Sequence, residues 1–377
     1  MKKIHGKFRP LIQAITHVFH NRFIVISGLL IITSCSHKQE IDTEKGSIPD
    51  VQSSNQTTSN IPTHTLSDLK IGPNSDPIYT LQGHTGRVWA LSHSPDGRYL
   101  ASGSTDGQIK IWDLQSGQNV RTLTGHDSSV RSLAFAPDGI MLATGGEDGI
   151  IRLWDMSSGN EAMTIQAHDQ VVRDLAFDPL GRYIGSSSYD GTAKIWGMES
   201  GTLIQTLSGH TDTVNTLAFA PSGEILATGS GSVFNPPADY SIRLWNPLSG
   251  EAIAQLHSHT DNVRELVFSP DGYFIASVSD DRTLKLWDVE TQAVIKTFEG
   301  HESDIPSVVF SEHGEVLITA SYDRTVRFWN RQTGLEMYQL PEHPSQVWVV
   351  SYSANSETLA TGGNDGVIRV WNIQVAN

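Results

Sequence analysis

One pattern, which opens with a histidine and closes with a tryptophan, recurs seven times and constrains the fold more than any other feature. The repeated histidines are His84, His126, His168, His210, His259, His301 and His343. The matching tryptophans are Trp112, Trp154, Trp196, Trp245, Trp287, Trp329 and Trp371. The spacing from His84 to Trp112 recurs in six copies, whereas His210 and Trp245 lie further apart, so the fourth copy carries an insertion. A fixed period of this length indicates a repeat architecture, with one structural unit per copy.

Each copy contains short apolar runs separated by turn-forming residues, which favours strands over helices. In the first copy the runs 99–102 and 109–112 are separated by Asp-Gly at 106–107, and Ser-Pro-Asp-Gly at 94–97 precedes them. Pro, Asp and Gly are typical of tight turns. The pattern predicts about four strands per copy and an all-β fold.

The Gly-His near the start of the copies, the Trp-Asp or its variants at the end and the period of about 40 residues resemble the WD40 family. The resemblance covers residues 78–373 and rests on seven concordant copies. It implies a seven-bladed β-propeller, with one copy per blade. The last copy stops at residues 371–373, after its third strand, whereas residues 77–84 match the segments that lead into the other copies. The N-terminal strand should therefore complete the last blade and close the ring without an open sheet edge.

The resemblance also implies a buried hydrogen-bonded set of four residues in every blade, here called the tetrad: a His, a Ser or Thr, an Asp and a Trp. Besides the histidines and tryptophans above, the seven tetrads contain Ser102 and Asp106, Thr144 and Asp148, Ser186 and Asp190, Thr228 and Asp239, Ser277 and Asp281, Thr319 and Asp323, and Thr361 and Asp365. A Ser-His-Asp set also suggests a hydrolase triad, but seven periodic copies favour a structural repeat. Histidines that lie one to a blade cannot converge on one metal ion.

The N-terminal part of the chain, before the first copy, predicts an export signal and a tether. Residues 1–34 combine basic residues, an apolar run at 23–32 and Thr33-Ser34, as a signal peptide does. The run is short for a transmembrane helix. Residues 32–35 resemble a bacterial lipobox, so we expect lipidation of Cys35, the only cysteine; an ordinary cysteine after a signal anchor is the alternative. Residues 36–76 are polar and should form a disordered tether, with residues 77–377 as the propeller.

Charge and motif content limit the chemistry that the chain can perform. Of the 26 basic and 41 acidic side chains, residues 1–76 hold 8 and 6, which leaves 18 basic and 35 acidic on the remainder. Nucleic acids and anionic membrane surfaces are poor partners for such an acidic body. The sequence has no glycine-rich phosphate loop, no cysteine and histidine cluster and no nucleophile outside the repeats. We therefore expect no enzyme activity, no cofactor and no metal, but a monomeric, lipid-anchored scaffold of the bacterial cell envelope.

In WD40 proteins, partners bind the narrower top face, built from the third and fifth residues after the His and the residue before the turn Asp. Here those positions include four arginines and four large aromatics, which are typical of interface hot spots: Arg87, Trp89, Arg131, Arg173, Tyr189, Arg264, Tyr322 and Trp348. Trp89 and Trp348 share position five after the His, in blades that ring closure makes neighbours. They are the two tryptophans that the repeat does not require, and we expect them, with Arg87 and Arg131, to bind an extended acidic peptide.

Two other functions remain open from the sequence. One is an enzyme or small-ligand receptor that uses the central channel, which acidic, His or Cys side chains on the axis would favour. The eighth residue after the His is small in every copy, which counts against it: Ser92, Ala134, Ala176, Ala218, Val267, Val309 and Ser351. The other is a cytoplasmic adaptor.

Overall fold

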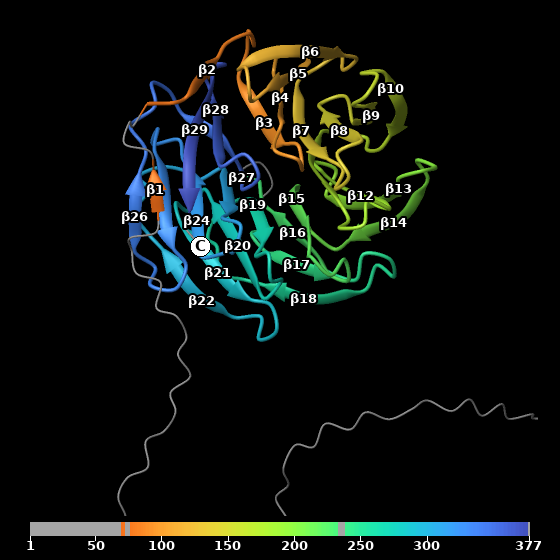
Figure 1. The fold of residues 1–377 in the computed structure, drawn as a ribbon. Helices are drawn as coiled ribbons and strands as arrows, with labels where there is room; N and C mark the ends of the chain where they lie inside the picture. Colours follow the sequence, from red (N-terminus) through yellow and green to blue (C-terminus); the bar gives the residue numbers. More distant parts are fainter. Residues whose placement is uncertain (1–68, 72–75, 233–237, 376–377) are drawn as a thin grey trace, which may run out of the picture. The chain divides into compact units, whose positions relative to one another are not determined.

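A computed structural model describes residues 69–71, 76–232 and 238–375 of the chain. In these residues it contains 29 β-strands and no helix, and seven antiparallel sheets follow one another around a central axis (Figure 1). The predicted all-β, seven-bladed propeller is therefore confirmed. The signal peptide, Cys35 and most of the expected tether lie outside the described residues.

The blades are consecutive along the chain, with the innermost strand first. Blade one contains β3 (Val88–His93), β4 (Tyr99–Ser104), β5 (Gln108–Asp113) and β6 (Gln118–Thr124); blade two contains β7 (Val130–Phe135), β8 (Met141–Gly146), β9 (Ile150–Asp155) and β10 (Glu161–Gln166). Blade three contains β11 (Val172–Phe177), β12 (Tyr183–Ser188), β13 (Thr192–Gly197) and β14 (Leu203–Ser208); blade four contains β15 (Val214–Phe219), β16 (Leu226–Ser230), β17 (Ile242–Trp245) and β18 (Ala252–Leu256). Blade five contains β19 (Val263–Phe268), β20 (Phe274–Ser279), β21 (Leu284–Asp288) and β22 (Val294–Phe298); blade six contains β23 (Ser307–Phe310), β24 (Val316–Ala320), β25 (Val326–Asn330) and β26 (Glu336–Gln339).

Blade seven joins the two ends of the ring, as the sequence predicts. It contains β27 (Val347–Ser353), β28 (Thr358–Gly363), β29 (Ile368–Val375) and β2 (Tyr79–Leu81). β2 pairs with β29 from Tyr79 opposite Val370 to Leu81 opposite Ile368. A further strand, β1 (Leu69–Ile71), pairs with the distal end of β29. The expectation that residues 36–76 have no fold is therefore wrong for β1, because β29 extends beyond β2 and offers it an unpaired edge.

The hydrophobic core lies between blades. One cluster combines Ile109, Ile111 and Leu123 of blade one with Leu133 and Leu142 of blade two. The same arrangement recurs between the following blades, so each sheet buries both faces against its neighbours. This explains why the strands contain continuous apolar runs instead of a strict alternation.

Candidate functional site

Six of the seven tetrads form a complete hydrogen-bonded chain. In blade five, His259 Nδ1 lies 2.8 Å from Asp281 Oδ2, His259 Nε2 lies 2.8 Å from Ser277 Oγ, and Trp287 Nε1 donates to the same Oγ at 2.8 Å. Because a carboxylate only accepts, Nδ1 carries the proton and Nε2 accepts from the hydroxyl. The chains in blades one, two, three, four and six have the same contacts.

The tetrad of blade seven is open, contrary to the expectation of seven equivalent sets. His343 Nε2 still lies 2.9 Å from Thr361 Oγ1, and Trp371 Nε1 donates to that oxygen at 3.3 Å. Asp365, however, accepts from Arg369 at 2.9 Å, and His343 Nδ1 is buried without a partner. Burial, with the nearby Arg369 charge, lowers the pKa of His343 to about 4.

Two neighbouring positions explain why Asp365 turns away. Arginine also precedes the tryptophan by two residues in blades two, four and six. There either a glutamate holds the arginine or a hydroxyl holds the aspartate: Glu161 in blade two, Ser241 in blade four, and both Glu336 and Thr325 in blade six. Blade seven has Pro77 and Val367 at these positions, so Arg369 takes the carboxylate.

A β-bulge in the inner strand sets the direction of the predicted partner-binding residues. In blades one to five and seven the pairing register of the inner strand shifts between the fourth and sixth residues after the His. The fifth residue is therefore left out of the ladder, and a bulge re-aims its side chain. Trp89, Arg131, Arg173, Arg264 and Trp348 all line one cavity of about 80 Å³ at the axis. These residues, with Arg87, Tyr189 and Tyr322, are called the top rim below.

The two extra tryptophans lie against one another, as their positions in neighbouring blades suggest. The Trp89 and Trp348 ring centroids are 4.5 Å apart in an edge-to-face arrangement, and Tyr322 lies 4.2 Å from Trp348. The Arg87 guanidinium lies 4.1 Å from the Trp348 centroid, and that of Arg131 lies 3.8 Å from the Trp89 centroid. Both indoles are partly buried. The aromatic part of the top rim is thus already ordered by its own arginines.

Several rim arginines are engaged by rim acceptors, which the sequence did not reveal. Arg131 Nε donates to Glu147 at 2.8 Å, and Arg87 Nε donates to Asn364 at 2.8 Å across the blade boundary. Arg264 Nε donates to Asp280 at 2.6 Å. Burial opposes the charge of Arg264, but Asp280 outweighs it and raises the pKa of Arg264.

The sixth residue after each His forms an inner ring that sequence reasoning missed. Its members are Ala90, Ser132, Asp174, Thr216, Glu265, Ser307 and Val349. From blade three to blade seven each polar member accepts a backbone N–H of the next blade: Asp174 from Leu217 at 3.1 Å, Thr216 from Leu266 at 3.3 Å, Glu265 from Val308 at 2.6 Å, and Ser307 from Val350 at 3.1 Å. These bonds connect the innermost strands around the channel.

The inner ring places two acidic side chains on the axis, which is the feature that would favour a ligand in the channel. Burial raises the pKa of Asp174. Burial, with the nearby Asp174 carboxyl, raises the pKa of Glu265 to about 8. Both carboxyls nevertheless accept backbone hydrogen bonds from the next blade, so their position has a structural explanation. An acid within an apolar inner strand was the available sequence signal.

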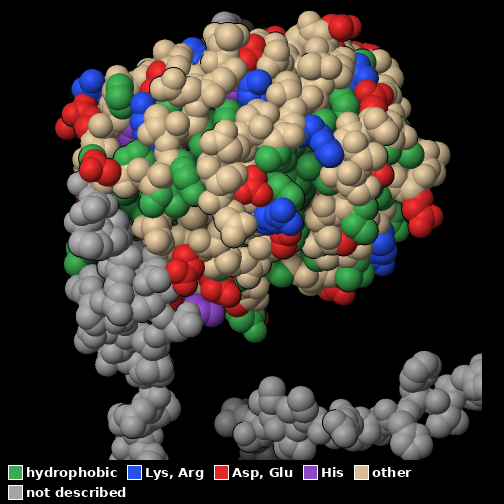
Figure 2. All heavy atoms as spheres, turned by 45° about the horizontal axis from the view of Figure 1, so that its top comes forward, with side chains coloured by type: hydrophobic (Ala, Val, Ile, Leu, Met, Phe, Trp, Pro, Cys, Tyr) green, Lys and Arg blue, Asp and Glu red, His purple; other side chains and the backbone are tan. Residues whose placement is uncertain are grey.

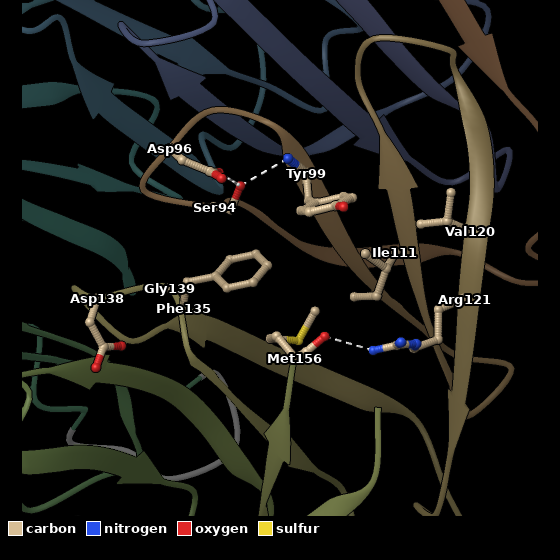
Figure 3. Close-up of a pocket in the computed structure, with 10 residues that line it drawn as sticks. All are labelled: Ser94, Asp96, Tyr99, Ile111, Val120, Arg121, Phe135, Asp138, Gly139 and Met156. Carbon is tan, nitrogen blue, oxygen red and sulfur yellow. Dashed lines mark hydrogen bonds between the residues drawn. The ribbon is translucent and has the colours of Figure 1, made fainter. Parts of the chain in front are cut away.

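A second cavity, of about 280 Å³, lies between blades one and two at the end opposite the top rim (Figure 3). Tyr99, Ile111, Phe135 and Met156 form its apolar wall, and Arg121 donates to the Met156 carbonyl at 2.8 Å. Its acidic residues belong to the turns of the repeat. None of the predicted site residues lines it.

Two further kinds of feature would bear on function, a metal site and a membrane-spanning helix. Within the described part of the chain, no group of His, Cys, Asp and Glu side chains is arranged to hold a metal ion. No helix in the described residues is long and apolar enough to cross a membrane. On the face drawn in Figure 2, acidic and basic side chains are interspersed.

A closed ring of seven blades with repeated tetrads defines the WD40-type β-propellers.

Comparison with known families agrees with this class. Residues 187–377 match the family described as IFT122 first beta-propeller. Residues 75–113, 117–155 and 159–197 each match the WD domain, G-beta repeat. The chain therefore belongs to the WD40-repeat β-propellers, in the family of the IFT122 first beta-propeller.

Individual relatives are similar over about one blade. The ribosome biogenesis protein ERB1 of Debaryomyces hansenii is 51% identical over 39 residues, or 10% of this chain and 5% of that protein. The BOP1 homolog of Arabidopsis thaliana, also a ribosome biogenesis protein, is 41% identical over 51 residues, or 14% and 7%. The target of rapamycin complex subunit wat1 of Schizosaccharomyces pombe is 42% identical over 40 residues, or 11% and 13%. The chain thus spans a small part of each relative's length.

Proposed function

We propose that the protein is a non-catalytic scaffold of the bacterial cell envelope, anchored by a lipid on Cys35, that binds a protein or peptide segment on its top rim. The observation that carries the binding role is the contact between Trp89 and Trp348 at the channel mouth. Neither indole belongs to the hydrophobic clusters between blades. Aromatic and arginine side chains dominate interface hot spots, and rigid ones lose little entropy on binding.

The internal contacts of the rim support binding by a preformed surface. Arg87 and Arg131 lie over the indole rings and also have polar acceptors in Asn364 and Glu147. Their role is therefore to hold the two indoles in place, and a partner meets rings whose orientation is already fixed. Preorganisation of this kind reduces the free-energy cost of association.

The course of β29 keeps the start of β1 away from the top rim. β29 begins near the rim, just after Asn364 and Asp365, and its far end at residues 373–375 pairs with β1. Leu69, the first residue of β1, consequently lies at the end of the propeller opposite the top rim, so β1 leaves the rim open to a partner.

The binding proposal is tested by exchanging single aromatic side chains. The variants Trp89→Ala and Trp348→Ala should weaken capture of partners from the cell envelope by about 1–3 kcal/mol each, as hot-spot truncation does. Their melting temperatures should change little. Tyr273→Ala is the matched control, since Tyr273 is an exposed aromatic (69%) outside the rim. If melting collapses while the folded fraction still binds, the indoles are structural and the proposal is wrong.

Anchoring is tested separately through the cysteine. Cys35→Ala should move the full-length protein from the membrane fraction and the detergent phase to the aqueous phase. Cys35→Ser is the isosteric control and should behave in the same way, because only a thiol accepts the lipid. Unchanged detergent partitioning of both variants would refute the anchor without touching the binding role of the rim.

A further inference from the structure

One rim arginine differs from the others in having no partner. Arg87, Arg131 and Arg264 each donate to a rim acceptor. Arg173, on β11, has no hydrogen bond or ion pair with any residue that the structure describes, although it is partly buried and lines the 80 Å³ cavity. No described residue supplies an acceptor to this guanidinium, so a ligand that enters the cavity with a carboxylate can form a charge-assisted hydrogen bond with it.

The charge of Arg173 acts inside the channel mouth. It opposes the effect of burial on the pKa values of Asp174 and Glu265, which burial raises. It also opposes burial at Tyr322, on the far side of the ring. These effects agree with its place among the residues that line the axial cavity.

Three other residues that line the cavity each carry a polar atom that is buried without a partner. The indole nitrogens of Trp89 and Trp348 are buried without a partner, and an indole N–H can only donate. Ser132, which is 4% exposed, also lines the cavity, and its Oγ has no partner. The Arg173 guanidinium is the group among these that carries a charge, so the ligand that it selects is an anion.

Size and charge select the kind of anion. A cavity of about 80 Å³ admits a group such as the carboxymethyl end of a side chain, and not a large ligand. A phosphate dianion would meet only one unpaired arginine, in a cavity that Asp174 and Glu265 also line. We infer that Arg173 receives a single carboxylate of the partner segment, from an acidic side chain or a chain terminus, beside the indole rings of Trp89 and Trp348. This inference rests on the proposed binding function of the top rim.

The test uses small probes that need no knowledge of the partner. Acetate and its neutral counterpart acetamide are titrated into the ¹⁵N-labelled protein, and the indole N–H resonances are followed. Acetate should shift the resonances of Trp89 and Trp348, while the seven tetrad tryptophans stay unchanged and report an intact fold. Acetamide should shift none. Arg173→Gln should weaken the acetate effect at least about tenfold, as loss of a charged hydrogen bond does.

A second arginine variant and two blocked peptides sharpen the result. Arg182→Gln is the matched control, because Arg182 belongs to the same blade, is exposed, and pairs with Asp178 away from the rim. It should retain the acetate response. The peptides acetyl-Gly-Glu-Gly-amide and acetyl-Gly-Gly-Gly with a free carboxyl end distinguish a side chain from a chain terminus, and stronger binding by either supports the inference.

Three outcomes would overturn the inference. They are an absent acetate response, an equal response in Arg173→Gln, and tighter binding of inorganic phosphate than of acetate. Failure here is separable from failure of the proposed function. If the tryptophan variants lose partner capture while acetate has no effect, the rim binds partners without a carboxylate in the channel. If acetate binds at Arg173 but the tryptophan variants capture partners normally, the carboxylate site exists and the two indoles are not the partner-binding site.

Discussion

The His93 imidazole Nδ1 lies 2.8 Å from Ser351 Oγ, and this contact joins the first blade to the last. Its Nε2 lies 3.1 Å from Thr358 Oγ1, also of blade seven. His93 occupies a position that is Phe in blades two to six. Nearby, Asn355 donates to the Pro95 carbonyl at 2.6 Å. His93, where blades two to six have Phe, and Asn355 thus form polar bonds across the ring closure.

The ring closure should be sensitive to acid. Burial lowers the pKa of His93 to about 3, from 6.5 in the unfolded chain. Below pH 6.5 the unfolded chain binds a proton at His93, whereas the folded protein does not until about pH 3. The stability that the neutral His93 contributes is therefore complete above pH 6.5 and is lost as pH falls toward 3. Between pH 7 and 5 the loss should be about 2 kcal/mol. His93→Phe should remove this part of the loss in urea unfolding. The exposed control His257→Gln should keep the full loss, and an unchanged pH dependence in His93→Phe would contradict the prediction.

Equivalent aspartates should differ in their contribution to stability. Asp281→Ala removes the close acceptor of His259 Nδ1, which keeps Thr283 Oγ1 at 3.4 Å, and leaves the Thr260 N–H without its acceptor, so it should destabilise the fold by about 2–3 kcal/mol. Asp365→Ala removes the pair with Arg369 and the turn hydrogen bond from the Val367 N–H, neither of which holds His343, and should cost under about 1 kcal/mol. Chemical denaturation of the two variants checks this. Equal losses would mean that the tetrad of blade seven is as closed as that of blade five.

A single hydroxyl should close the open tetrad. In blade six, Thr325 donates to Asp323 at 2.6 Å and lies 3.3 Å from His301. Val367 is the corresponding residue in blade seven, so Val367→Thr should return Asp365 to His343 and stabilise the protein by about 1 kcal/mol. The imidazole ¹H and ¹⁵N shifts of His343 should then move toward those of the other tetrads. A lower melting temperature, with unchanged shifts, would argue against it.

The inner ring should make the fold less stable as pH rises from 4.5 to 8. The folded pKa of Glu265 is raised to about 8, compared with 4.5 in the unfolded chain. The stability contributed is complete below pH 4.5 and is lost as pH rises through 8. Glu265→Gln stays neutral and still offers an oxygen to the Val308 N–H, so at pH 9 it should be more stable than the wild type by on the order of 2–4 kcal/mol. The exposed control Glu224→Gln should have the same free energy of unfolding as the wild type at every pH. The same result for Glu265→Gln would contradict the prediction, because it would mean that the Glu265 carboxyl titrates as an exposed one does.

The sequence was sufficient for the fold because seven copies repeat the same information. Turn residues, apolar runs and the unmatched half-copy at residues 77–84 together determine strand number, blade number and ring closure. It was also sufficient for the neighbourhood of Trp89 and Trp348, which follows from blade order alone. β1 was missed because three residues of a polar segment carry no periodicity, and only the overhang of β29 gives them a place to pair.

What the sequence did not reveal depends on competition between partners in space. Asp365 is the expected residue type at the expected position, yet it binds Arg369, since Pro77 and Val367 supply neither of the competing groups. The sequence also does not predict which arginines of the rim are paired, because the contacts of Glu147 with Arg131 and of Asp280 with Arg264 form across the bulge. The side chains of the inner ring point toward the axis because of the β-bulge, and no local sequence pattern predicts that bulge.

The joint pairing of β1 and β2 with β29 has a mechanical consequence. The hydrogen bonds of an antiparallel pair run perpendicular to the strands. A force applied to Leu69 along the strand direction strains the bonds from residues 69–71 to 373–375 together and in shear, and does not open them one after another. β2 lies behind β1 as a second, independent attachment to the same strand. Tension on the N-terminal segment is therefore borne by a shear-loaded strand pair before it reaches blade seven and the ring closure.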